Sequence, residues 1–401
     1  MLLRDLSELD GSYMPDNLPH RELQITQMSR LLGSLMRNTR PSNIVLFGKT
    51  GTGKTSTTRH VVRLLLEATR ETVRVCYVNC QIFDSQYSIL VNLVNLYSRN
   101  EQENIPLSGW PLDRIYSELI RRVQESRSFL LVVLDEIDRL VAKNGSDSLY
   151  VILKIADDTE RHLSSIIGIT NNPSFVDSLD ARVKSRLNQE NLIFPPYNAS
   201  ELKDILTYRT NGMLREGSLD ESALNLCAAI AAREHGDARR ALDLMRISID
   251  IAVRDNTERV TENEVMAARE RLEVDVLRES IRSLPLHSKI LLLSCVVTQE
   301  MDQRPMLTGE IYENYVSICK ELGYSSLSFR RIGDMLTDLD DVGLVSSKIQ
   351  SMGRYGRSRL TQLAENSQTM RKYLMEEEAL QAFRGSNLGR QSRLKFGEDS
   401  S

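Results

Sequence analysis

A glycine-rich stretch near the start of the chain combines residue types and a spacing that suit phosphate binding. Residues 48–55 read Gly-Lys-Thr-Gly-Thr-Gly-Lys-Thr and fit the pattern Gly-x4-Gly-Lys-Ser/Thr. Glycines let backbone N–H groups turn inward around a polyphosphate, and the N-terminus of a following helix adds partial positive charge. We expect Lys54 to reach the β- and γ-phosphates and the Thr55 hydroxyl to bind Mg²⁺. The residues predicted to bind nucleotide here are Gly48, Lys49, Thr50, Gly51, Thr52, Gly53, Lys54 and Thr55.

The elements on either side of this loop have the order that the motif requires. Residues 44–47 are apolar and partly β-branched, as a short buried strand should be. Residues 56–70 carry an apolar stripe at helical spacing. Strand, glycine loop and helix in this order argue against a chance glycine-rich turn. The sequence therefore predicts that the chain binds a nucleoside triphosphate.

Polar residues follow two more apolar runs. Residues 129–134 read as a central parallel strand, and Asp135 and Glu136 come directly after it. Parallel α/β sheets bind their ligands at this end of the strands. Asp135 suits a water-mediated Mg²⁺ ligand, and Glu136 suits the base that orients and deprotonates an attacking water. Residues 165–171 end in Asn171, which either hydrogen-bonds the γ-phosphate or the water, or simply terminates a strand.

Two further strands, at 73–79 and 191–194, complete the pattern of a three-layer α/β core with five parallel strands. An extended arm at 13–22 either packs on the nucleotide base or lies on the surface. A helix follows it to about Arg40, with an inward face formed by Leu23, Ile25, Met28, Leu31, Leu32 and Leu35.

From residue 200 to about residue 272 the strand pattern gives way to helical spacing, which predicts a small helical lid. Gly236 and Asp237 signal the start of its third helix. Arg239 lies in the first turn, where it opposes the helix dipole, so we expect an anionic partner elsewhere. A phosphate and an acidic side chain of the lid are the two alternatives.

Residues 284–363 predict a winged helix-turn-helix, because three helices precede a strand and a basic, glycine-containing ribbon. The third helix is expected to turn Phe329 inward and Arg330 and Arg331 outward. The candidate DNA contacts are Ser326, Ser328, Arg330, Arg331, Arg354, Tyr355, Arg357 and Arg359. The alternative is a winged helix that binds protein, since four acidic residues near these positions would repel DNA: Asp334, Asp338, Asp340 and Asp341.

The overall composition of the 401-residue chain gives no general attraction to nucleic acid, because the formal charge is -4. Any DNA contact therefore needs a local basic patch. Five cysteines without a Cys-x2-Cys pair read as small buried hydrophobes in a reducing compartment. No apolar run approaches the ~20 residues of a membrane span, and no leader peptide is visible. We expect a cytoplasmic protein without a membrane partner.

Taken together, these motifs resemble the archaeal replication-initiator family, which is related to the first subunit of the eukaryotic origin recognition complex and to cell division control protein six. The resemblance spans nearly the whole chain and rests on the winged helix and on residues 13–22, 48–55, 135–138, 168–171, 179–186 and 236–240. It implies an AAA+ core with a helical lid and a C-terminal winged-helix domain that binds ATP or ADP with Mg²⁺. We expect the core with its arm at 1–199, the lid at 200–272, the winged helix at 273–375 and a partly disordered tail at 376–401.

The resemblance also implies roles for single residues. The four catalytic candidates are Glu136, Asn171, Arg239 and Arg186. Among them, Asn171 matches the first sensor, Arg239 matches the second, and Arg186 matches an arginine finger that acts on a neighbouring subunit's nucleotide, with Arg182 close by. Two positions match the nucleotide site at the lid junction, Tyr197 and Arg209. The expected Mg²⁺ ligands are Thr55 and Asp135. Residues 82–113 match an insertion that reaches DNA in this family, although here they include few basic residues.

The function implied by the resemblance is ATP-dependent initiation of DNA replication. The chain would bind double-stranded origin DNA at the nucleoid and help recruit or load an MCM-type replicative helicase, with other initiator subunits as further partners. Slow ATP hydrolysis would act as a switch. The competing functions are a helicase- or clamp-loader-like ATPase and a signalling ATPase, in both of which the winged helix binds protein instead of DNA.

Overall fold

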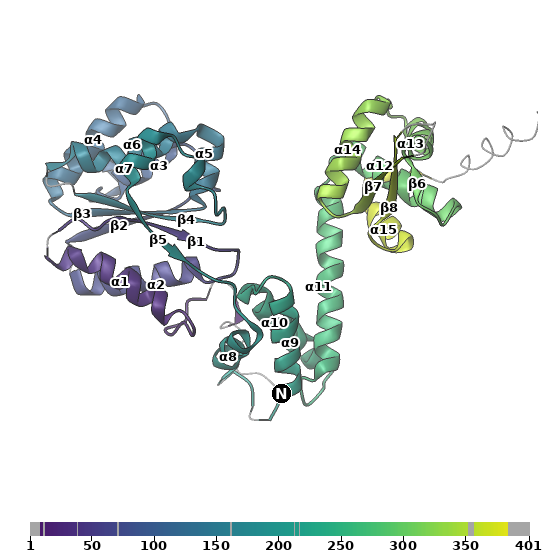
Figure 1. Ribbon diagram of the computed structural model, residues 1–401, viewed down its shortest axis with the longest axis horizontal. Coiled ribbons are helices and arrows are strands. Elements are labelled where there is room, and N and C mark those ends of the chain that lie inside the picture. Colours follow the sequence, from purple (N-terminus) through teal and green to yellow (C-terminus); the bar gives the residue numbers. More distant parts are fainter. Residues whose placement is uncertain are drawn as a thin grey trace, which may run out of the picture. The chain divides into compact units, whose positions relative to one another are not determined.

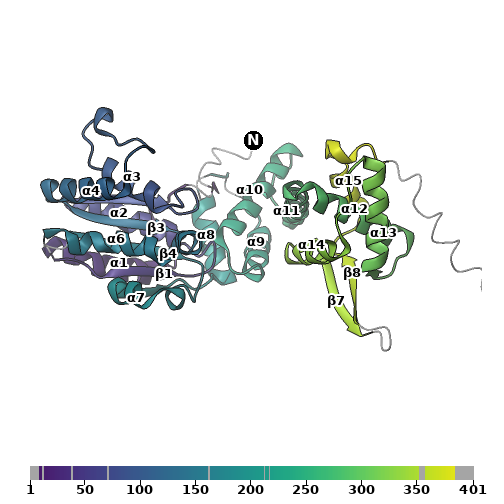
Figure 2. The same cartoon turned by 90° about the horizontal axis from the view of Figure 1, so that it is seen from above.

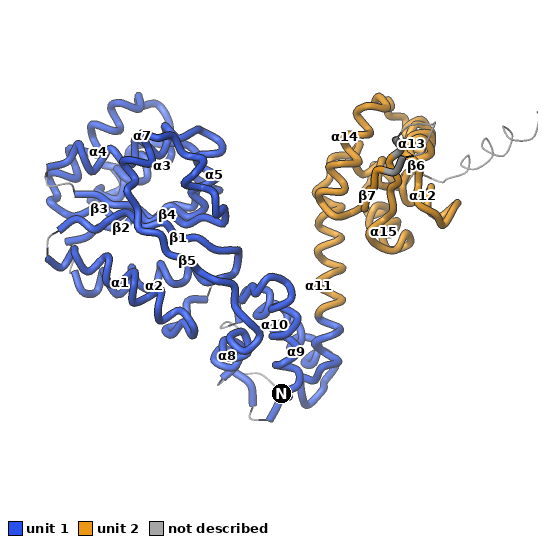
Figure 3. Tube along the Cα trace, in the orientation of Figure 1, with its two compact units in different colours: residues 1–268 blue, residues 269–401 orange. Residues whose placement is uncertain are grey.

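The protein is described by a computed structural model that covers residues 9–10, 13–37, 39–69, 72–160, 163–211, 213–215, 217–351 and 357–383. The chain forms two compact units, residues 1–268 and residues 269–401 (Figure 3). Helix α11, Glu262–Ser283, contains the boundary between them. Residues 384–401, where most of the predicted disordered tail falls, and residues 352–356 of the predicted ribbon lie outside the described residues.

A five-stranded parallel sheet forms the centre of unit 1, as the sequence predicts (Figure 1). The strand order is β2-β3-β4-β1-β5, with bounds β1 Asn43–Phe47, β2 Val73–Asn79, β3 Phe129–Asp135, β4 Ser164–Thr170 and β5 Gln189–Ile193. Phe47 pairs with Thr170, and Asp135 pairs with Ile169. The strands that precede the glycine loop, Glu136 and Asn171 therefore end side by side.

Helices cover both faces of this sheet, because successive side chains of each strand point to opposite sides. One face packs against α1, Glu22–Leu32, and α2, Lys54–Thr69, through residues such as Leu46 and Val133. The other face packs against five helices through residues such as Val45 and Val132. These helices are α3 Gln86–Asn95, α4 Leu112–Ser126, α5 Ile137–Asn144, α6 Ser146–Asp158 and α7 Ala181–Leu187. Figure 1 shows the resulting three layers.

The helix after the arm is shorter than predicted. α1 ends at Leu32, and a 3₁₀ turn, Gly33–Arg37, replaces the expected helix to about Arg40. Its buried positions are Gln24, Met28, Leu32 and, in the 3₁₀ turn, Leu35. Leu23 is 65% exposed, so its predicted inward orientation is wrong. The reason is helical phase, since Leu23 falls one residue outside the buried stripe.

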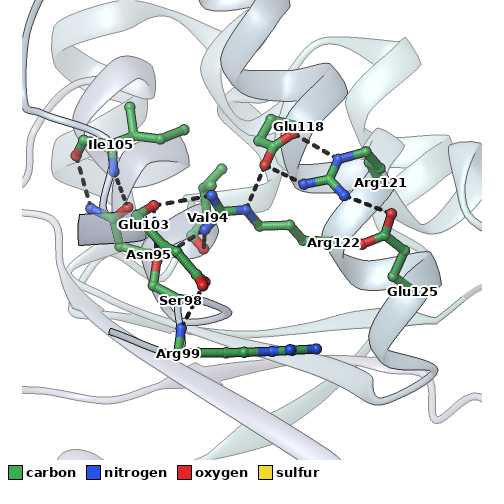
Figure 4. Close-up of polar contacts among 10 residues, drawn as sticks. All are labelled: Val94, Asn95, Ser98, Arg99, Glu103, Ile105, Glu118, Arg121, Arg122 and Glu125. Carbon is green, nitrogen blue, oxygen red and sulfur yellow. Dashed lines mark hydrogen bonds and ion pairs between the residues drawn. The ribbon is translucent and has the colours of Figure 1, made fainter. Parts of the chain in front are cut away.

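A polar network fixes the loop between α3 and α4 (Figure 4). The Arg122 guanidinium donates to the carbonyl oxygens of Val94 and Glu103 at 3.3 and 3.0 Å. Glu118 accepts hydrogen bonds from both Arg121 and Arg122, at 2.6 and 2.7 Å. The hydrogen bond from Arg121 is the largest cause that lowers the pKa of Glu118 to about 2. The guanidiniums of Arg121 and Arg122 are therefore neutralised by carboxylates of the same helix.

Three helices of unit 1 form the expected lid: α8 Ala199–Thr210, α9 Glu221–Arg233 and α10 Ala238–Arg254. Asp237 caps α10, because its carboxylate accepts hydrogen bonds from the N–H groups of Arg239 and Arg240. The predicted start signal of the third lid helix is thus confirmed. Just before it, Gly236 has a φ of 68°, and the backbone of Tyr197 lies against its α-carbon.

Unit 2 has a winged-helix architecture, as predicted. After the end of α11, its α-helices among the described residues are α12 Leu286–Met301, α13 Thr308–Leu322, α14 Phe329–Asp341 and α15 Ser367–Leu374. α12 lies at the centre, with Ile290 to Val297 all buried. The strands β6 Met306–Leu307, β7 Val345–Ser351 and β8 Arg357–Leu363 form a sheet in the order β6-β8-β7. Figure 2 shows β7 and β8 extending together from the helical part of this unit.

Two details of unit 2 differ from the sequence interpretation. Phe329 is 51% exposed, so its predicted inward orientation is wrong. As the first residue of α14, it packs edge-on against Tyr312 with ring centroids 5.2 Å apart and leaves its other side open. The helix α15 was not foreseen, and its Met370 and Leu374 are buried against the core of the unit.

The structure also shows the state of the cysteines and the length and apolarity of the helices. All five cysteines are buried and free, as predicted for small hydrophobic residues. Among the described residues, no helix has the length and apolarity to cross a membrane.

We expect Gly236→Ala to destabilise the lid more than Gly217→Ala. Both glycines have a positive φ, 68° and 79°, which costs an alanine about 1–2 kcal/mol. At Gly236 an added Cβ would also lie 2.4 Å from the carbonyl oxygen of Tyr197, whereas at Gly217 it would meet no described atom within 4 Å. Scanning calorimetry of the two variants should show the larger drop in melting temperature for Gly236→Ala. Equal drops would contradict the close approach of residues 197 and 236.

Candidate functional site

A cavity of about 600 Å³ lies in unit 1 where the arm, the glycine loop, the sheet edge and the lid meet. It brings together most of the predicted nucleotide and catalytic residues. Those that line it are Thr50, Gly51, Thr52, Gly53, Lys54, Thr55, Asp135, Glu136, Asn171, Tyr197, Arg209 and Arg239. Gly48 and Lys49 do not line it, but their carbonyl oxygens accept hydrogen bonds from the Lys54 ammonium, each at 2.7 Å.

Lys54 is the buried cation of the cavity. Its third hydrogen bond goes to Oδ1 of Asn171 at 2.8 Å, so the glycine loop and the end of β4 meet at this ammonium group. Burial lowers the pKa of Lys54 to about 8, against the opposing effect of the Asp135 carboxylate. Arg239 lowers it further, because two positive charges lie near each other. Two cations, Lys54 and Arg239, therefore lie close together at the cavity, together with the carboxylates of Asp135 and Asp237.

Asp135 lies at the end of β3 and is held by three donors. Its Oδ2 accepts a hydrogen bond from Thr55 Oγ1 at 3.0 Å and another from the Tyr77 hydroxyl at 2.5 Å. Its Oδ1 accepts from the N–H of Glu136 at 3.1 Å. Glu136 has a φ of 55° and precedes α5, so the chain turns sharply here and Glu136 lies at the cavity.

The residues at this edge of the sheet fit a magnesium ion. The Thr55 hydroxyl and the Asp135 carboxylate are hard oxygen donors 3.0 Å apart, which suits an ion that keeps several waters and takes few protein ligands. Among the described residues, no group of three or more His, Cys, Asp or Glu side chains forms an all-protein metal cage. Any Mg²⁺ here would therefore need further oxygen ligands from phosphates and water.

The start of lid helix α10 contacts the glycine loop directly. The N–H of Ala238 donates to the carbonyl oxygen of Gly51 at 3.1 Å. Gly51 has a φ of 70°, and a Cβ at this position would overlap the Asp237 carboxylate, so a glycine is needed for the approach. Because Ala238 contacts the glycine loop, the next residue, Arg239, lines the cavity together with Lys54. Arg239 belongs to the lid and Lys54 to the core.

Arg239 is exposed toward the cavity and forms no ion pair with a carboxylate of the described residues, whereas its neighbour Arg240 pairs with Glu234 at 2.7 Å. Of the two partners considered for Arg239, the lid carboxylate is therefore not seen.

A buried arginine that the sequence interpretation missed joins the arm to the lid junction. Arg21 is 2% exposed, and its guanidinium donates to the carbonyl oxygens of His20, Thr52 and Pro195 at 2.8, 2.9 and 2.8 Å. The same group lies 3.7 Å from the ring centroid of Tyr197. Arginine is seldom fully buried, so nothing in the sequence suggested a buried Arg21. The only local signal was the position of Arg21 directly before the start of α1.

The arm itself lies along the cavity. Its lining residues are Tyr13, Met14, Pro15, Asn17, Leu18 and Pro19. Arg209 of α8 is buried, donates to the carbonyl oxygen of Asp10 at 2.9 Å and lies 4.9 Å from the ring centroid of Tyr13. The lid thus holds the arm over the site. The arm therefore lies beside the cavity, and its predicted packing on a nucleotide base stays a prediction.

Arg186 lies apart from the other catalytic candidates. It lines a second pocket of about 510 Å³ with Tyr150, Asp157, Arg182, Ser185 and Asn188. Its guanidinium forms an ion pair with Asp157 and lies 4.8 Å from the ring centroid of Tyr150. It does not line the first cavity, so it cannot act on a nucleotide held there by the same unit.

The candidate DNA contacts of unit 2 divide into three groups. Ser326 is exposed in the loop before α14, Arg330 and Arg331 are exposed in the first turn of this helix, and the Ser328 hydroxyl caps it by accepting from the N–H of Arg331. Arg359 of β8 donates to Gly333 and Thr337 of α14 at 2.8 and 2.9 Å, so it also fastens the ribbon to that helix. Arg354 and Tyr355 lie outside the described residues, as does the side chain of Arg357.

Comparisons with known proteins agree with these architectures. Family models match at three places: an AAA domain at residues 37–172, a Cdc6 AAA+ ATPase-type lid domain at 203–270 and a CDC6 C-terminal winged helix domain at 279–373. The ORC1-type DNA replication protein 2 of Thermoplasma acidophilum is 54% identical over 97% of this chain and 95% of its own length. The ORC1-type DNA replication protein of Picrophilus torridus is 50% identical over 99% of this chain and 96% of its own.

A solved structure of an ORC1 protein also resembles this chain. The structure of the Aeropyrum pernix ORC1 protein in complex with DNA has a TM-score of 0.80 and 38% sequence identity to this chain, and covers 94% of this chain and 97% of that one. Because the match covers 94% of this chain, one alignment includes the core, the lid and the winged helix. The chain is therefore a member of the ORC1/Cdc6-type family of DNA replication initiators, with an AAA+ core, a Cdc6-type lid and a C-terminal winged helix.

Proposed function

We propose that this initiator binds ATP with Mg²⁺ in the cavity of unit 1 and uses the bound nucleotide as a switch. The observation that carries the proposal is the convergence of Lys54, Thr55, Asp135, Asn171 and Arg239 on one cavity. A triphosphate would supply the ion-pair partner that Arg239 lacks among the described carboxylates. ADP would satisfy fewer of these groups, so the two nucleotides would hold α10 with different strength.

In this proposal each residue has a separate task during slow hydrolysis. Lys54 and Arg239 stabilise charge on the phosphates, while Asn171 holds the Lys54 ammonium and orients the attacking water. Glu136 accepts the proton of that water. Mg²⁺, held through Thr55 and Asp135, would supply charge neutralisation at the phosphates. Tyr197 and Arg209 position the lid and the arm around the nucleotide.

We further propose that an isolated chain hydrolyses ATP slowly. Arg186 lies outside the cavity and is paired with Asp157, so within one chain no arginine finger reaches the site from α7. A finger supplied by another subunit is worth about 10³–10⁵ in rate for related phosphoryl transfers. Other initiator subunits would therefore be partners, with Arg186 presented to the neighbouring nucleotide.

The proposed DNA partner is double-stranded origin DNA, bound through the winged helix of unit 2. Arg330 and Arg331 are exposed at the start of α14, as a phosphate-contacting surface requires. The similar Aeropyrum pernix ORC1 protein was solved in complex with DNA, which supports the same use here. We also propose that the chain recruits an MCM-type helicase at the nucleoid. The proposed domain boundaries lie at residues 199, 272 and 375.

The segment at 82–113 is not proposed as a major phosphate contact. It holds one basic residue, Arg99, and four acidic ones. Two of the three arginines of the neighbouring α4, Arg121 and Arg122, are already paired with Glu118 and Glu125, and the third, Arg114, lies over the ring of Trp110. Its contribution to a salt-dependent affinity for DNA would therefore be small.

A second candidate function is favoured by the acidic side chains of α14. Asp334, Asp338 and Asp341 are exposed on the helix that would enter a groove, and Arg359 is engaged within the unit. A loader or signalling ATPase whose winged helix binds a basic protein surface would use such a helix. Salt-dependent binding to duplex DNA separates the two functions.

Nucleotide affinity should depend on pH through Lys54. Its pKa of about 8 in the free chain should rise when phosphates stabilise the ammonium, so binding takes up protons above that pH. We expect the proton uptake per ATP to be larger at pH 8.5 than at pH 7, because the fraction of Lys54 that is neutral before binding increases with pH. Calorimetry in two buffers with different ionisation heats measures this number. A constant uptake across this range would contradict the assignment.

Arg239→Ala should weaken ATP binding about 10–100-fold, as expected for the loss of a charge-assisted hydrogen bond, and should weaken ADP binding less. Arg240→Ala is the matched control, because Arg240 is adjacent on α10 but already pairs with Glu234. Competition against a fluorescent adenine nucleotide measures all four affinities. If both variants lose ATP and ADP affinity equally, the second-sensor role of Arg239 is wrong.

Arg354→Ala and Arg357→Ala should each weaken duplex binding and reduce the slope of log affinity against log salt by about 1. Arg121→Ala is the control, because Arg121 is an exposed arginine of unit 1 that pairs with two glutamates. Fluorescence anisotropy with a labelled duplex at several salt concentrations gives the slopes. Unchanged slopes for both ribbon variants would favour the protein-binding alternative.

A further inference from the structure

Tyr77 is a partly buried residue of β2 whose hydroxyl reaches the predicted magnesium ligand. Its hydroxyl donates to Oδ2 of Asp135 at 2.5 Å. Burial and the nearby Asp135 carboxylate raise the pKa of the phenol, so the hydroxyl keeps its proton and acts as the donor. None of the nucleotide-site motifs in the sequence includes this tyrosine.

The position of Tyr77 follows from the register of the sheet. β2 and β3 run parallel, with Tyr77 beside Val133 and Asn79 beside Asp135. The side chain of Tyr77 packs against the apolar cluster between the sheet and α1 and α2. The Arg59 guanidinium of α2 lies 5.0 Å from its ring centroid. Packing on one side and a cation on the ring thus fix where the hydroxyl points.

The hydrogen bonds of Asp135 leave little freedom to its carboxylate. An ionised carboxylate offers about four acceptor positions. Thr55 and Tyr77 use two at Oδ2, and the N–H of Glu136 uses one at Oδ1. About one position therefore remains for a further donor, such as a water bound to a metal ion. Without the Tyr77 hydroxyl, the carboxylate could rotate and offer different oxygens.

We propose that Tyr77 is a positioning residue for magnesium: by donating to Oδ2 of Asp135, it holds the carboxylate in the orientation that accepts from metal-bound water. Tyr77 does not line the cavity, so it acts through Asp135 and not on the nucleotide itself. This inference rests on the proposed binding of a nucleotide with Mg²⁺. It adds a residue from β2 to a site otherwise built from the glycine loop and the ends of β3 and β4.

The test compares Tyr77→Phe with the parent chain by measuring the dissociation rate of a fluorescent adenine nucleotide. The rate is measured in EDTA and across a Mg²⁺ titration. Loss of a partner that orients a metal ligand typically costs 10–100-fold in metal affinity. We therefore expect the half-effective Mg²⁺ concentration to rise 10–100-fold in Tyr77→Phe, while the rate in EDTA stays within about twofold of the parent.

Tyr87→Phe is the matched control. The Tyr87 hydroxyl is buried without a hydrogen-bond partner in the described residues, so its removal should leave the Mg²⁺ titration unchanged. In an Asp135→Asn background, Tyr77→Phe should cause no further change, because the oriented carboxylate is already lost. The removal of one hydroxyl keeps the ring packing, and a melting temperature close to that of the parent verifies the fold.

The outcomes separate the inference from the function on which it rests. An unchanged Mg²⁺ titration in Tyr77→Phe would overturn the positioning role. Equal weakening in EDTA and in Mg²⁺ would also overturn it, because that result reports a packing defect and not a metal effect. If the parent chain binds no adenine nucleotide under either condition, the proposed function fails, and this inference fails with it.

Discussion

The contact between the glycine loop and the start of α10 is the interaction on which the site of unit 1 depends. One backbone hydrogen bond, from Ala238 to Gly51, joins two subdomains that the chain builds about 190 residues apart. It requires a glycine on one side and a capping aspartate on the other. Because of it, a helix N-terminus and an arginine reach the same cavity as the buried ammonium of Lys54. Anion binding is the natural use of such an arrangement.

Charge around the cavity is arranged unevenly, and this gives the site its chemistry. Lys54 is satisfied by neutral oxygens of the loop and of Asn171, and Arg239 has no carboxylate partner among the described residues. The Asp135 carboxylate lies close enough to Lys54 to oppose the fall in its pKa, and it is held by two hydroxyls and a backbone N–H. A site that combines two cations with an oriented carboxylate suits a polyphosphate with a hard metal ion. The Arg21 guanidinium joins the glycine loop, the arm and the lid junction by hydrogen bonds to one carbonyl oxygen of each.

Much of this was predictable from the sequence, because strands with continuous apolar runs and a motif with fixed spacing carry strong local signals. The loop at 48–55, Asp135, Asn171 and the Asp237 cap all lie where those signals placed them. Leu23 and Phe329 were misjudged, because the side of a terminal helical turn that becomes buried depends on what packs against it. Arg21 and Tyr77 were missed for a related reason. Their partners come from other elements, and only the fold brings them together.

Hydrogen exchange of the full chain, with and without ATP and Mg²⁺, tests the central claim most directly. If a triphosphate is held between the glycine loop and α10, exchange should slow in peptides that cover residues 48–58 and in peptides that cover residues 236–242. The two regions should be protected together, at the same nucleotide concentration. Protection of the loop alone, or of neither region, would contradict the account, because the lid would then take no part in holding the nucleotide.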